Sequence, residues 1–478
     1  MKHLTKHLSL IMVLSTIFYL TSASDDTPCE IHIEGGVETS DCPSLHSCIN
    51  GFCVHKSIFP LETIEYPGTI ILMFLAGLAN AGGLGGGALL SPILLVFFNY
   101  DTSKAIMITY SIVFGGSLGN FLNVAFQRHP TTKRSFVDYD LTLICMPVMV
   151  AGANVGVLLN RISPSAAILI GLVCTMIYTG KKVYLKAKNT YAAETNQRSQ
   201  SFLSTEAAPQ EASKEENSEI SISQSRDSFY YDDIKSSMPT ELQAILREDK
   251  QLFPPLKLLI VFAMLAFNVL IMILKGSKSS HSLIGLEYCE KGYWLVFIIG
   301  MIGCYGFYRL GMKEVNKRLE IKRENNYKTE GSGFTLTEDL VQKVGGLSFL
   351  AGIAAGLLGL GGGMVMSPFL LQLGMEPQTL AATVGFFVVQ TSFITLFQSF
   401  YAGDVSGVET IFFLSAALVG SIGVSMLLNY IVRKYDRPSL MLFALSFVIL
   451  LSLIVMPTFA VYKSIDDPEE MLEIGSVC

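Results

Sequence analysis

Long apolar runs, separated by short polar or charged segments, occupy most of the chain beyond residue 65. An α-helix needs about 20 apolar residues to cross the hydrocarbon core of a bilayer. Runs of that length predict eight full crossings, at 103–127, 139–160, 163–183, 255–275, 292–311, 378–402, 407–431 and 438–462. The pattern therefore predicts an all-α polytopic membrane protein.

Two further apolar runs, 66–98 and 340–374, are each interrupted by a glycine cluster. The first cluster reads GLGGGALLSP from Gly83, and the second reads GLGGGMVMSP from Gly359. Each glycine costs a helix about 1 kcal/mol relative to alanine, and a broken helix in lipid exposes backbone groups that only protein or a polar cavity can satisfy. Interrupted segments at matching positions of two halves are typical of a transporter's substrate site.

The helices that follow the two clusters repeat in order and length, with 103–183 corresponding to 378–462. If both broken runs crossed the membrane fully, the basic loops after residues 127, 183 and 311 would lie outside, against the positive-inside rule. If each run enters and leaves on one side, these loops become cytoplasmic. We therefore predict two inverted repeats, each a glycine-rich re-entrant or broken helix plus three transmembrane helices, with two linking helices between them.

The N-terminal residues have the layout of a secretory signal, with basic residues before an apolar run at 8–20 and small residues at 21–23. An uncleaved membrane anchor is the alternative. Four cysteines follow closely: Cys29, Cys42, Cys48 and Cys53. In an oxidising compartment they predict two disulfides, in any of three pairings, and zinc binding is the weaker alternative.

Residues 186–252 depart from the apolar pattern, because they are rich in Ser, Glu, Gln and Lys and too poor in apolar residues to form a core. They predict a mostly disordered loop with a short surface helix within 232–252. The chain accordingly divides into a signal peptide (1–23), an extracytoplasmic cysteine-rich segment (24–65), a first transmembrane repeat (66–185), this cytoplasmic loop (186–252), two linking helices with a basic cytoplasmic loop (253–339), a second transmembrane repeat (340–463) and an extracytoplasmic tail (464–478).

Composition agrees with a membrane protein, since 50% of the residues are hydrophobic and 15% are charged. The sequence shows no basic tract for nucleic acid, no metal-ligand cluster and no cofactor motif: neither glycine cluster is a G-x-G-x-x-G or a P-loop. No catalytic Ser/His/Asp grouping or paired intramembrane carboxylate is apparent, and Asp138 and Asp140 lie at a helix end, where solvation or capping is expected. We therefore expect no enzyme activity, no cofactor and no metal.

A short helix can begin just after each glycine cluster, near the middle of the membrane. A helix start offers unpaired N–H groups and the positive end of its dipole, so two facing starts can bind an anion without a basic side chain. The candidate substrate-binding residues are Gly83, Gly85, Gly86, Gly87, Ser91, Gly359, Gly361, Gly362, Gly363, Ser367, Asn80 and Gln390.

The alternative for these residues is close helix packing, which glycine and serine commonly permit in lipid. Packing alone does not require a run of three glycines in both halves, so we favour a site at the clusters. Asn120 and Asn123 share a helix face and serve equally well for an interhelical hydrogen bond.

Both glycine motifs, together with Arg128-His129-Pro130 and the segments 137–141 and 152–157, resemble the plant-type branch of the sulfite exporter TauE/SafE family of membrane permeases. The resemblance covers about 66–183 and 340–462. It implies transport of sulfite or small organosulfonates. The family often has a Thr-Ser pair after each hairpin, where this chain has 108–111 (ITYS) and 383–385 (TVG), so no role is carried over to those positions.

The sequence thus predicts a permease of small anions that exposes a site between the two hairpins to each side in turn. An anion channel with the same site is one alternative, and a membrane receptor or scaffold that uses the cysteine-rich segment and the Ser-rich loop is another. The expected partners are a small anionic substrate and the lipid bilayer. A homo-oligomer is left open, as is the choice between the plasma membrane and an endomembrane.

Overall fold

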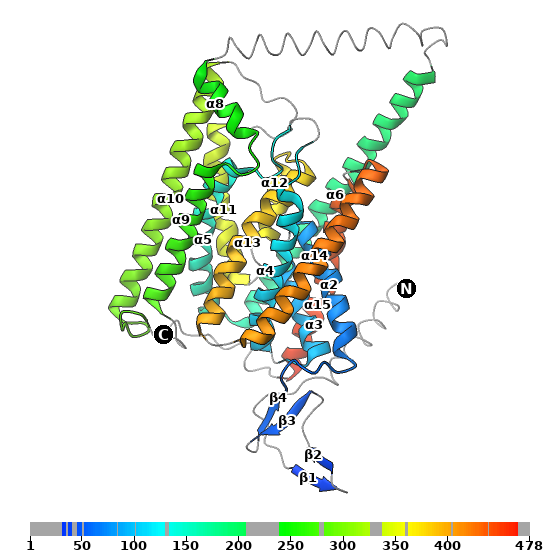
Figure 1. Cartoon of the computed structure of the whole chain (residues 1–478), viewed down its shortest axis with the longest axis vertical. Helices are drawn as coiled ribbons and strands as arrows, with labels where there is room; N and C mark the ends of the chain where they lie inside the picture. The colour runs from blue at the N-terminus through cyan, green and yellow to red at the C-terminus, as the bar shows by residue number, and fades with distance from the viewer. Residues whose placement is uncertain are drawn as a thin grey trace.

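The computed structural model describes a helical body with two small β-hairpins at one end (Figure 1). The described residues are 31–34, 37–40, 45–49, 52–83, 85–100, 102–129, 133–206, 239–276, 282–325, 337–358, 362–402, 405–437 and 439–466. The predicted signal peptide, Cys29, Cys42 and residues 467–478 lie outside them. We call the end of the body that carries the hairpins the β side, and the opposite end, where α8 lies, the α8 side.

The predicted all-α membrane fold is confirmed. In the described part of the chain, seven helices are long and apolar enough to cross a membrane: α4 (Thr102–Ala125), α5 (Tyr139–Ile162), α9 (Pro255–Lys275), α10 (Lys291–Glu324), α11 (Glu338–Leu358), α13 (Pro377–Ala402) and α14 (Gly407–Tyr435). Helices α6 (Ser165–Glu206) and α15 (Ser439–Asp466) stand where the other two crossings were predicted.

The first glycine-broken run forms α2 (Glu65–Ala81) and α3 (Gly87–Phe98), which fold back on each other. A Cβ added to Gly68 would lie 2.5 Å from the Cβ of Phe97, so the start of α2 touches the end of α3. Both ends meet the segment that follows β4, because Lys56 pairs with Glu65 at 2.8 Å and His55 Nε2 lies 2.6 Å from the Phe98 carbonyl oxygen. This run therefore begins and ends on the β side.

The second run forms α11 and α12 (Gly363–Gln372). Val341, near the start of α11, packs with Ile144 and Val315 on the α8 side. Glu376, just after α12, pairs with His129 at 2.7 Å, on the same side. The two runs thus enter from opposite sides, as inverted repeats require; the repeat relation itself stays a prediction.

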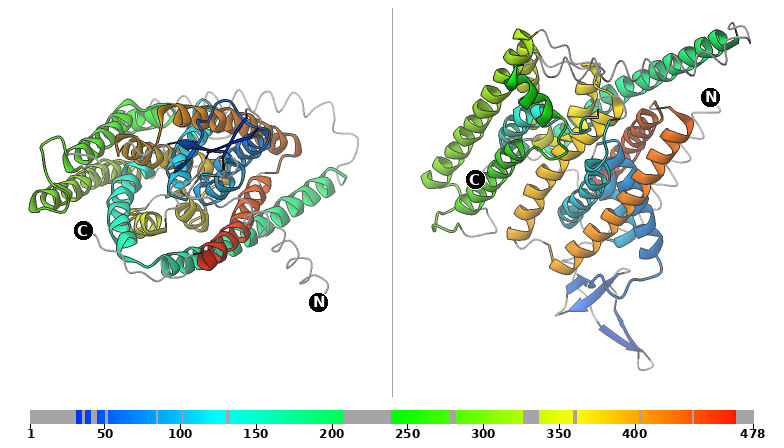
Figure 2. Two further views of the ribbon diagram at one scale, coloured as in Figure 1. Left: turned by 90° about the horizontal axis from the view of Figure 1, so that it is seen from below. Right: turned by 45° about the horizontal axis from the view of Figure 1, so that its top comes forward.

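Each broken run packs mainly on a helix of the other half, α2 on α14 and α11 on α5. The contact of α5 with α11 is backbone to backbone: a Cβ on Gly152 would lie 2.2 Å from the Phe349 oxygen, and one on Gly352 would lie 2.2 Å from the Met149 oxygen. Glycines four residues apart on both helices permit this approach. The two halves are therefore interlocked rather than placed side by side (Figure 2).

The predicted loop at 186–252 is wrong over its first part, because α6 continues without a break to Glu206 and extends beyond the helical body (Figure 1). Residues 181–206 contain no glycine or proline and many Lys, Ala, Glu and Gln, which favour a helix even where no core forms. Within 232–252 the expected short helix is α8 (Thr240–Asp249). Residues 207–238 lie outside the described part of the chain.

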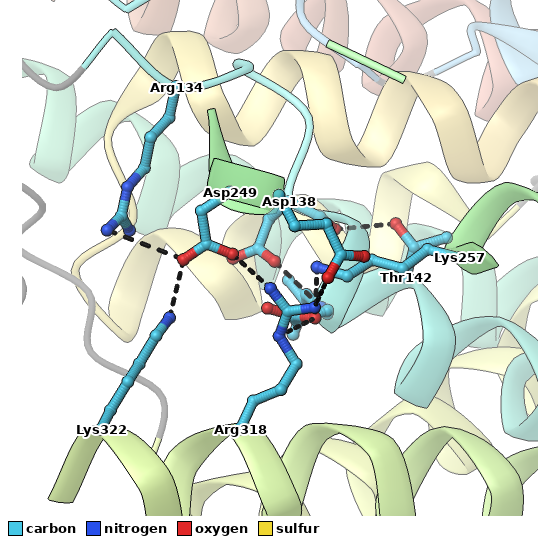
Figure 3. A network of polar contacts seen from close by, with 10 residues as sticks. Arg134, Asp138, Thr142, Asp249, Lys257, Arg318 and Lys322 are labelled. Carbon is cyan, nitrogen blue, oxygen red and sulfur yellow. Dashed lines mark hydrogen bonds and ion pairs between the residues drawn. The ribbon is translucent and has the colours of Figure 1, made fainter. Parts of the chain in front are cut away.

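An ion cluster fastens α8 to the body (Figure 3). Arg318 of α10 lies 2.7 Å from Glu248 and 2.6 Å from Asp249, and Lys322 lies 2.8 Å from Asp249. Asp140 accepts Lys257 at 2.7 Å. Asp138 caps α5 by accepting the Leu141 N–H at 3.0 Å, which is the capping role expected at a helix start.

The cysteine-rich segment forms two antiparallel hairpins that sequence analysis did not predict. They pair β1 (Ile31–Glu34) with β2 (Val37–Ser40), and β3 (His46–Ile49) with β4 (Phe52–His55), so that Cys48 stands opposite Cys53. Cys48 and Cys289 are both disulfide-bonded, and Cys289 was not among the predicted cysteines.

Candidate functional site

The turn between α2 and α3, which we call the first glycine turn, requires glycine because of its backbone conformation. Gly83, Gly85 and Gly86 have φ of 75°, 80° and 74°, in the left-handed region that other residues rarely adopt. Gly86 is also the N-cap residue of α3. The cluster therefore builds a reversal between α2 and α3 and sets the direction in which α3 begins.

The turn between α11 and α12, which we call the second glycine turn, requires glycine because a side chain would not fit there. Gly362, the N-cap residue of α12, has an ordinary φ of −60°, but a Cβ there would lie 2.6 Å from the Met149 sulfur. A Cβ on Gly363 would lie 2.5 Å from the carbonyl oxygen of Gly83. Gly359 and Gly361 lie outside the described residues. The same sequence motif thus meets two different physical needs.

The two turns touch each other against one face of α13. Gly83 and Gly363 are in direct contact, as the Gly363 distance shows. Val388 of α13 would lie 2.8 Å from a Cβ on Gly85 and 2.6 Å from one on Gly363. Side chains larger than hydrogen at these positions would separate the turns.

The starts of α3 and α12 are therefore neighbours. The Leu89 and Leu90 N–H groups both bond to the Gly86 oxygen, at 2.9 and 3.2 Å, and the Met366 N–H bonds to the Gly362 oxygen at 3.1 Å. The N–H groups of residues 87–88 and 363–365, at the start of each helix, have no acceptor within their own helix. Two positive dipole ends at one place can hold an anion.

The serines that follow the clusters differ in their bonding. Ser91 Oγ donates to the Gly87 oxygen at 3.2 Å and lies 3.0 Å from the Thr109 hydroxyl. Ser367 is fully buried, and its hydroxyl has no hydrogen-bond partner in the part of the chain that the structure describes. A buried hydroxyl without a partner is costly unless a ligand satisfies it.

Asn80 and Asn120 belong to a series of hydrogen bonds that links α2, α4 and α14 near the first glycine turn. Asn120 donates to the Asn80 carbonyl oxygen at 2.9 Å and accepts from Ser425 at 2.9 Å. The Asn80 amide donates back to Ala76 at 2.8 Å. The interhelical hydrogen bond predicted as one possibility for Asn120 is therefore present. Its partner Ser425 of α14 was not identified from the sequence, because no sequence pattern distinguishes it from the other serines of that helix.

Gln390 does not join the glycine turns. It lies about 200° around α13 from Val388, at 3.6 residues per turn, so it faces away from both turns. It is 3% exposed, and among the described residues neither its amide nitrogen nor its oxygen has a partner.

A cavity of about 660 Å³ leads from the α8 side to the first turn. Its lining includes Ala81, Asn120 and Ala381, and the Cα of Ala381 would lie 3.2 Å from a Cβ on Gly83. Arg128 and Arg433 stand at the other end of the lining. We call this cavity the vestibule. In the sequence these basic residues indicated only membrane orientation. Their place in one vestibule depends on the fold.

Comparison with known proteins gives one family throughout. The family model described as Sulfite exporter TauE/SafE matches residues 2–202 and 344–474. Sulfite exporter TauE/SafE family protein 5 of Arabidopsis thaliana is 27% identical over 81% of this chain and 82% of its own length. Family protein 1 of the same plant is 25% identical over 83% of this chain and 84% of its own length. No solved structure shows a significant match.

Proposed function

Because the chain belongs to the sulfite exporter TauE/SafE family, and is thereby a multi-pass membrane transporter of the small-anion type, we propose that it carries sulfite or a small organosulfonate. The contact of Gly363 with the Gly83 carbonyl oxygen supports this proposal most directly, because it brings the start of α12 against the turn that leads into α3. The amides of residues 87–88 and 363–365 would bind the oxygens of the anion. The proposal assigns no catalytic residue.

The Ser367 hydroxyl would donate a further hydrogen bond to the anion. The substrate would then satisfy a buried group that has no partner in the described part of the chain. Ser91 already has partners and would hold the first turn in shape. A neutral, amide-lined site suits an ion that must leave again, since no buried cation has to be separated from it.

Access would come from the α8 side in the conformation described, through the vestibule that ends at Ala81 and Asn120. The positive-inside rule makes this the cytoplasmic side. In the opposite conformation the site would open to the β side. The crossings of α2 with α14 and of α5 with α11 would move each hairpin together with a helix of the other half.

Uptake into proteoliposomes tests the proposal. Radiolabelled sulfite, sulfate and ethanesulfonate would be offered to the purified protein with and without imposed pH and Na⁺ gradients. We expect saturable flux of sulfite or ethanesulfonate. Flux that rises linearly with concentration and carries current would identify a channel, and no flux of any anion from folded protein would reject transport altogether.

Substituting Gly363→Ala tests whether the meeting of the turns carries the function. The added methyl would lie 2.5 Å from the Gly83 oxygen, so the helix starts must separate. We expect flux to fall at least about tenfold, because a shift of about 1 Å at a binding site is worth that much or more. The matched control is Gly407→Ala, also at the first residue of a helix, where a Cβ would meet nothing within 4 Å. Equal flux in both variants would remove the turns from the mechanism.

A further inference from the structure

Three buried valines surround the place where the two glycine turns meet. Val113 of α4 would lie 3.3 Å from a Cβ on Gly85. Val384 and Val388 of α13 would lie 3.2 and 2.6 Å from a Cβ on Gly363. Helices α4 and α13 each follow one of the two hairpins along the chain. The helix after each hairpin therefore covers the turns with apolar side chains, which we call the valine wall.

Within the valine wall, Val388 makes the closest approach to both turns. Its Cγ1 would lie 2.8 Å from a Cβ on Gly85, and its Cγ2 would lie 2.6 Å from one on Gly363. The corresponding distances for Val384 are longer, 3.5 Å from Gly83 and 3.2 Å from Gly363. Two carbon atoms that are not bonded keep about 3.5–4.0 Å apart. One added carbon therefore has no room at either turn while Val388 keeps its methyl groups.

The hydrogen-bond donors of the site belong to the two hairpins and not to the valine wall. The N–H groups of residues 87–88 and 363–365 have no acceptor within their own helix. The Ser367 hydroxyl, one turn further along α12, is fully buried and has no partner among the described residues. A valine methyl donates no hydrogen bond, so an anion oxygen directed at the wall would lose its water without replacement, which is costly.

The sulfur of sulfite suits a site with donors on one side and methyl groups on the other. Sulfite has three oxygens and a lone pair on sulfur, and the fourth position holds an oxygen in sulfate and a carbon in a sulfonate. With three oxygens at the N–H groups, the lone pair of sulfite faces the wall and needs neither a donor nor further room. The fourth oxygen of sulfate would find no donor there, and the carbon of a sulfonate would overlap the methyl groups.

We propose that Val388 is the residue that determines specificity at the glycine turns, because its methyl groups occupy the position of the fourth substituent on sulfur. This inference rests on the proposed function, and it deepens that function by naming how one side chain discriminates between anions. The native chain excludes sulfate because the wall lacks a donor. It excludes sulfonates because the wall lacks space.

Calorimetric titration of the purified protein in detergent with sulfite, sulfate and methanesulfonate measures this specificity without requiring flux. In the native chain we expect sulfite to bind at least about tenfold more tightly than the other two anions. Val388→Ala should raise the affinity for methanesulfonate relative to sulfite about tenfold or more, since one carbon in an apolar pocket is worth that much. Val388→Thr keeps the size and adds a hydroxyl, so it should raise the affinity for sulfate relative to sulfite about tenfold.

The matched control is Val389→Ala, the same substitution one residue further along α13. Val389 is half-buried and points about 100° away from Val388, at 3.6 residues per turn. The ratios of the three affinities should stay as in the native chain. A purely structural role of Val388 would lower the melting temperature and weaken all three anions together, which would overturn the inference.

The outcomes separate this inference from the proposed function. Saturable sulfite flux, with the same affinity ratios in Val388→Ala and Val388→Thr as in the native chain, would reject the role of Val388 and leave transport standing. A native chain that transports sulfite but binds sulfate or methanesulfonate as tightly would reject it too. Folded protein that neither binds nor transports any of these anions would reject both.

Discussion

Ser91 and Ser367 occupy matching places after the two glycine clusters, but their surroundings make them different residues. Ser91 has the Gly87 carbonyl and the Thr109 hydroxyl as partners, whereas Ser367 is fully buried and its hydroxyl makes no bond within the described residues. Burying an unsatisfied hydroxyl costs about 1–3 kcal/mol, whereas satisfying it stabilises. At the residue scale, Ser367 is therefore the serine that we propose to face the anion.

Replacing the two serines should give opposite results. Ser367→Ala removes a hydroxyl that bonds to nothing in the described chain, so the melting temperature should stay equal or rise while the KM for sulfite rises about tenfold. Ser91→Ala loses two bonds and should cost about 1 kcal/mol of stability. Thermal unfolding and sulfite uptake measure both effects. A lower melting temperature with unchanged KM in Ser367→Ala would show a structural role instead.

At the scale of elements, the crossing of α5 and α11 joins the two halves most closely. Gly152 and Gly156 face Gly352 and Gly356, and a Cβ on any of them would lie 2.2–2.3 Å from a backbone oxygen of the other helix. In lipid such close packing replaces the hydrophobic drive that holds soluble helices together. Because α11 is the long arm of the second hairpin, this crossing also sets the height at which α12 begins.

Gly352→Ala should therefore weaken both stability and transport. The methyl would lie 2.2 Å from the Met149 oxygen, and overpacking of this kind costs about 1–3 kcal/mol. Gly346→Ala, on the same helix, meets nothing within 4 Å and should be neutral or slightly stabilising, since alanine favours a helix. Thermal unfolding in detergent and sulfite flux distinguish the pair. Identical behaviour of the two variants would contradict a tight crossing.

At the scale of the whole molecule, α8 connects the end of the linker to the helical body through charge. Arg318 is 4% exposed in its side chain and lies between Glu248, Asp249 and Asp140. Burial raises the pKa of Asp249, but the charges of Lys322 and Arg318 outweigh burial and leave the pKa below its usual 3.8. Asp249 is thus ionised at neutral pH.

Arg318→Met should release α8 in a way that depends on pH. Removing one partner of a buried ion pair costs on the order of 3 kcal/mol, because carboxylates stay buried with fewer partners. A carboxyl whose pKa is lowered by folding stabilises above its unfolded pKa and loses that contribution as the pH falls through the folded value. The variant should therefore unfold at a lower temperature at pH 7, and its difference from the native chain should shrink below about pH 3.8.

Limited trypsin digestion supplies a second readout for α8, since cleavage after Arg247 and Lys250 should become faster in Arg318→Met at pH 7. Lys317→Met, on the same helix and outside the ion cluster, is the control. Equal cleavage rates in the two variants would show that α8 does not depend on the cluster.

Sequence by itself determined the all-α membrane class, because bilayer thickness fixes the length of an apolar crossing. It also determined the family and the places where helices break, because a glycine cluster is costly within a helix. The capping by Asp138 and the short helix near 240–249 followed from local chemistry in the same way. The helix predicted at 163–183 ends earlier than α6 does, because the polar composition beyond it was interpreted as disorder. A helix can continue through such a segment on helix propensity alone.

Only the tertiary structure decided which candidate residues meet. That Gly83 touches Gly363, that Gln390 turns away from both, and that Ser367 lacks the partners of Ser91 all depend on how α2, α12 and α13 pack. The vestibule likewise unites residues from four or more elements. Periodicity along one helix fixes which residues share a face, but it carries no information about which helix that face meets, and the binding chemistry depends on that meeting.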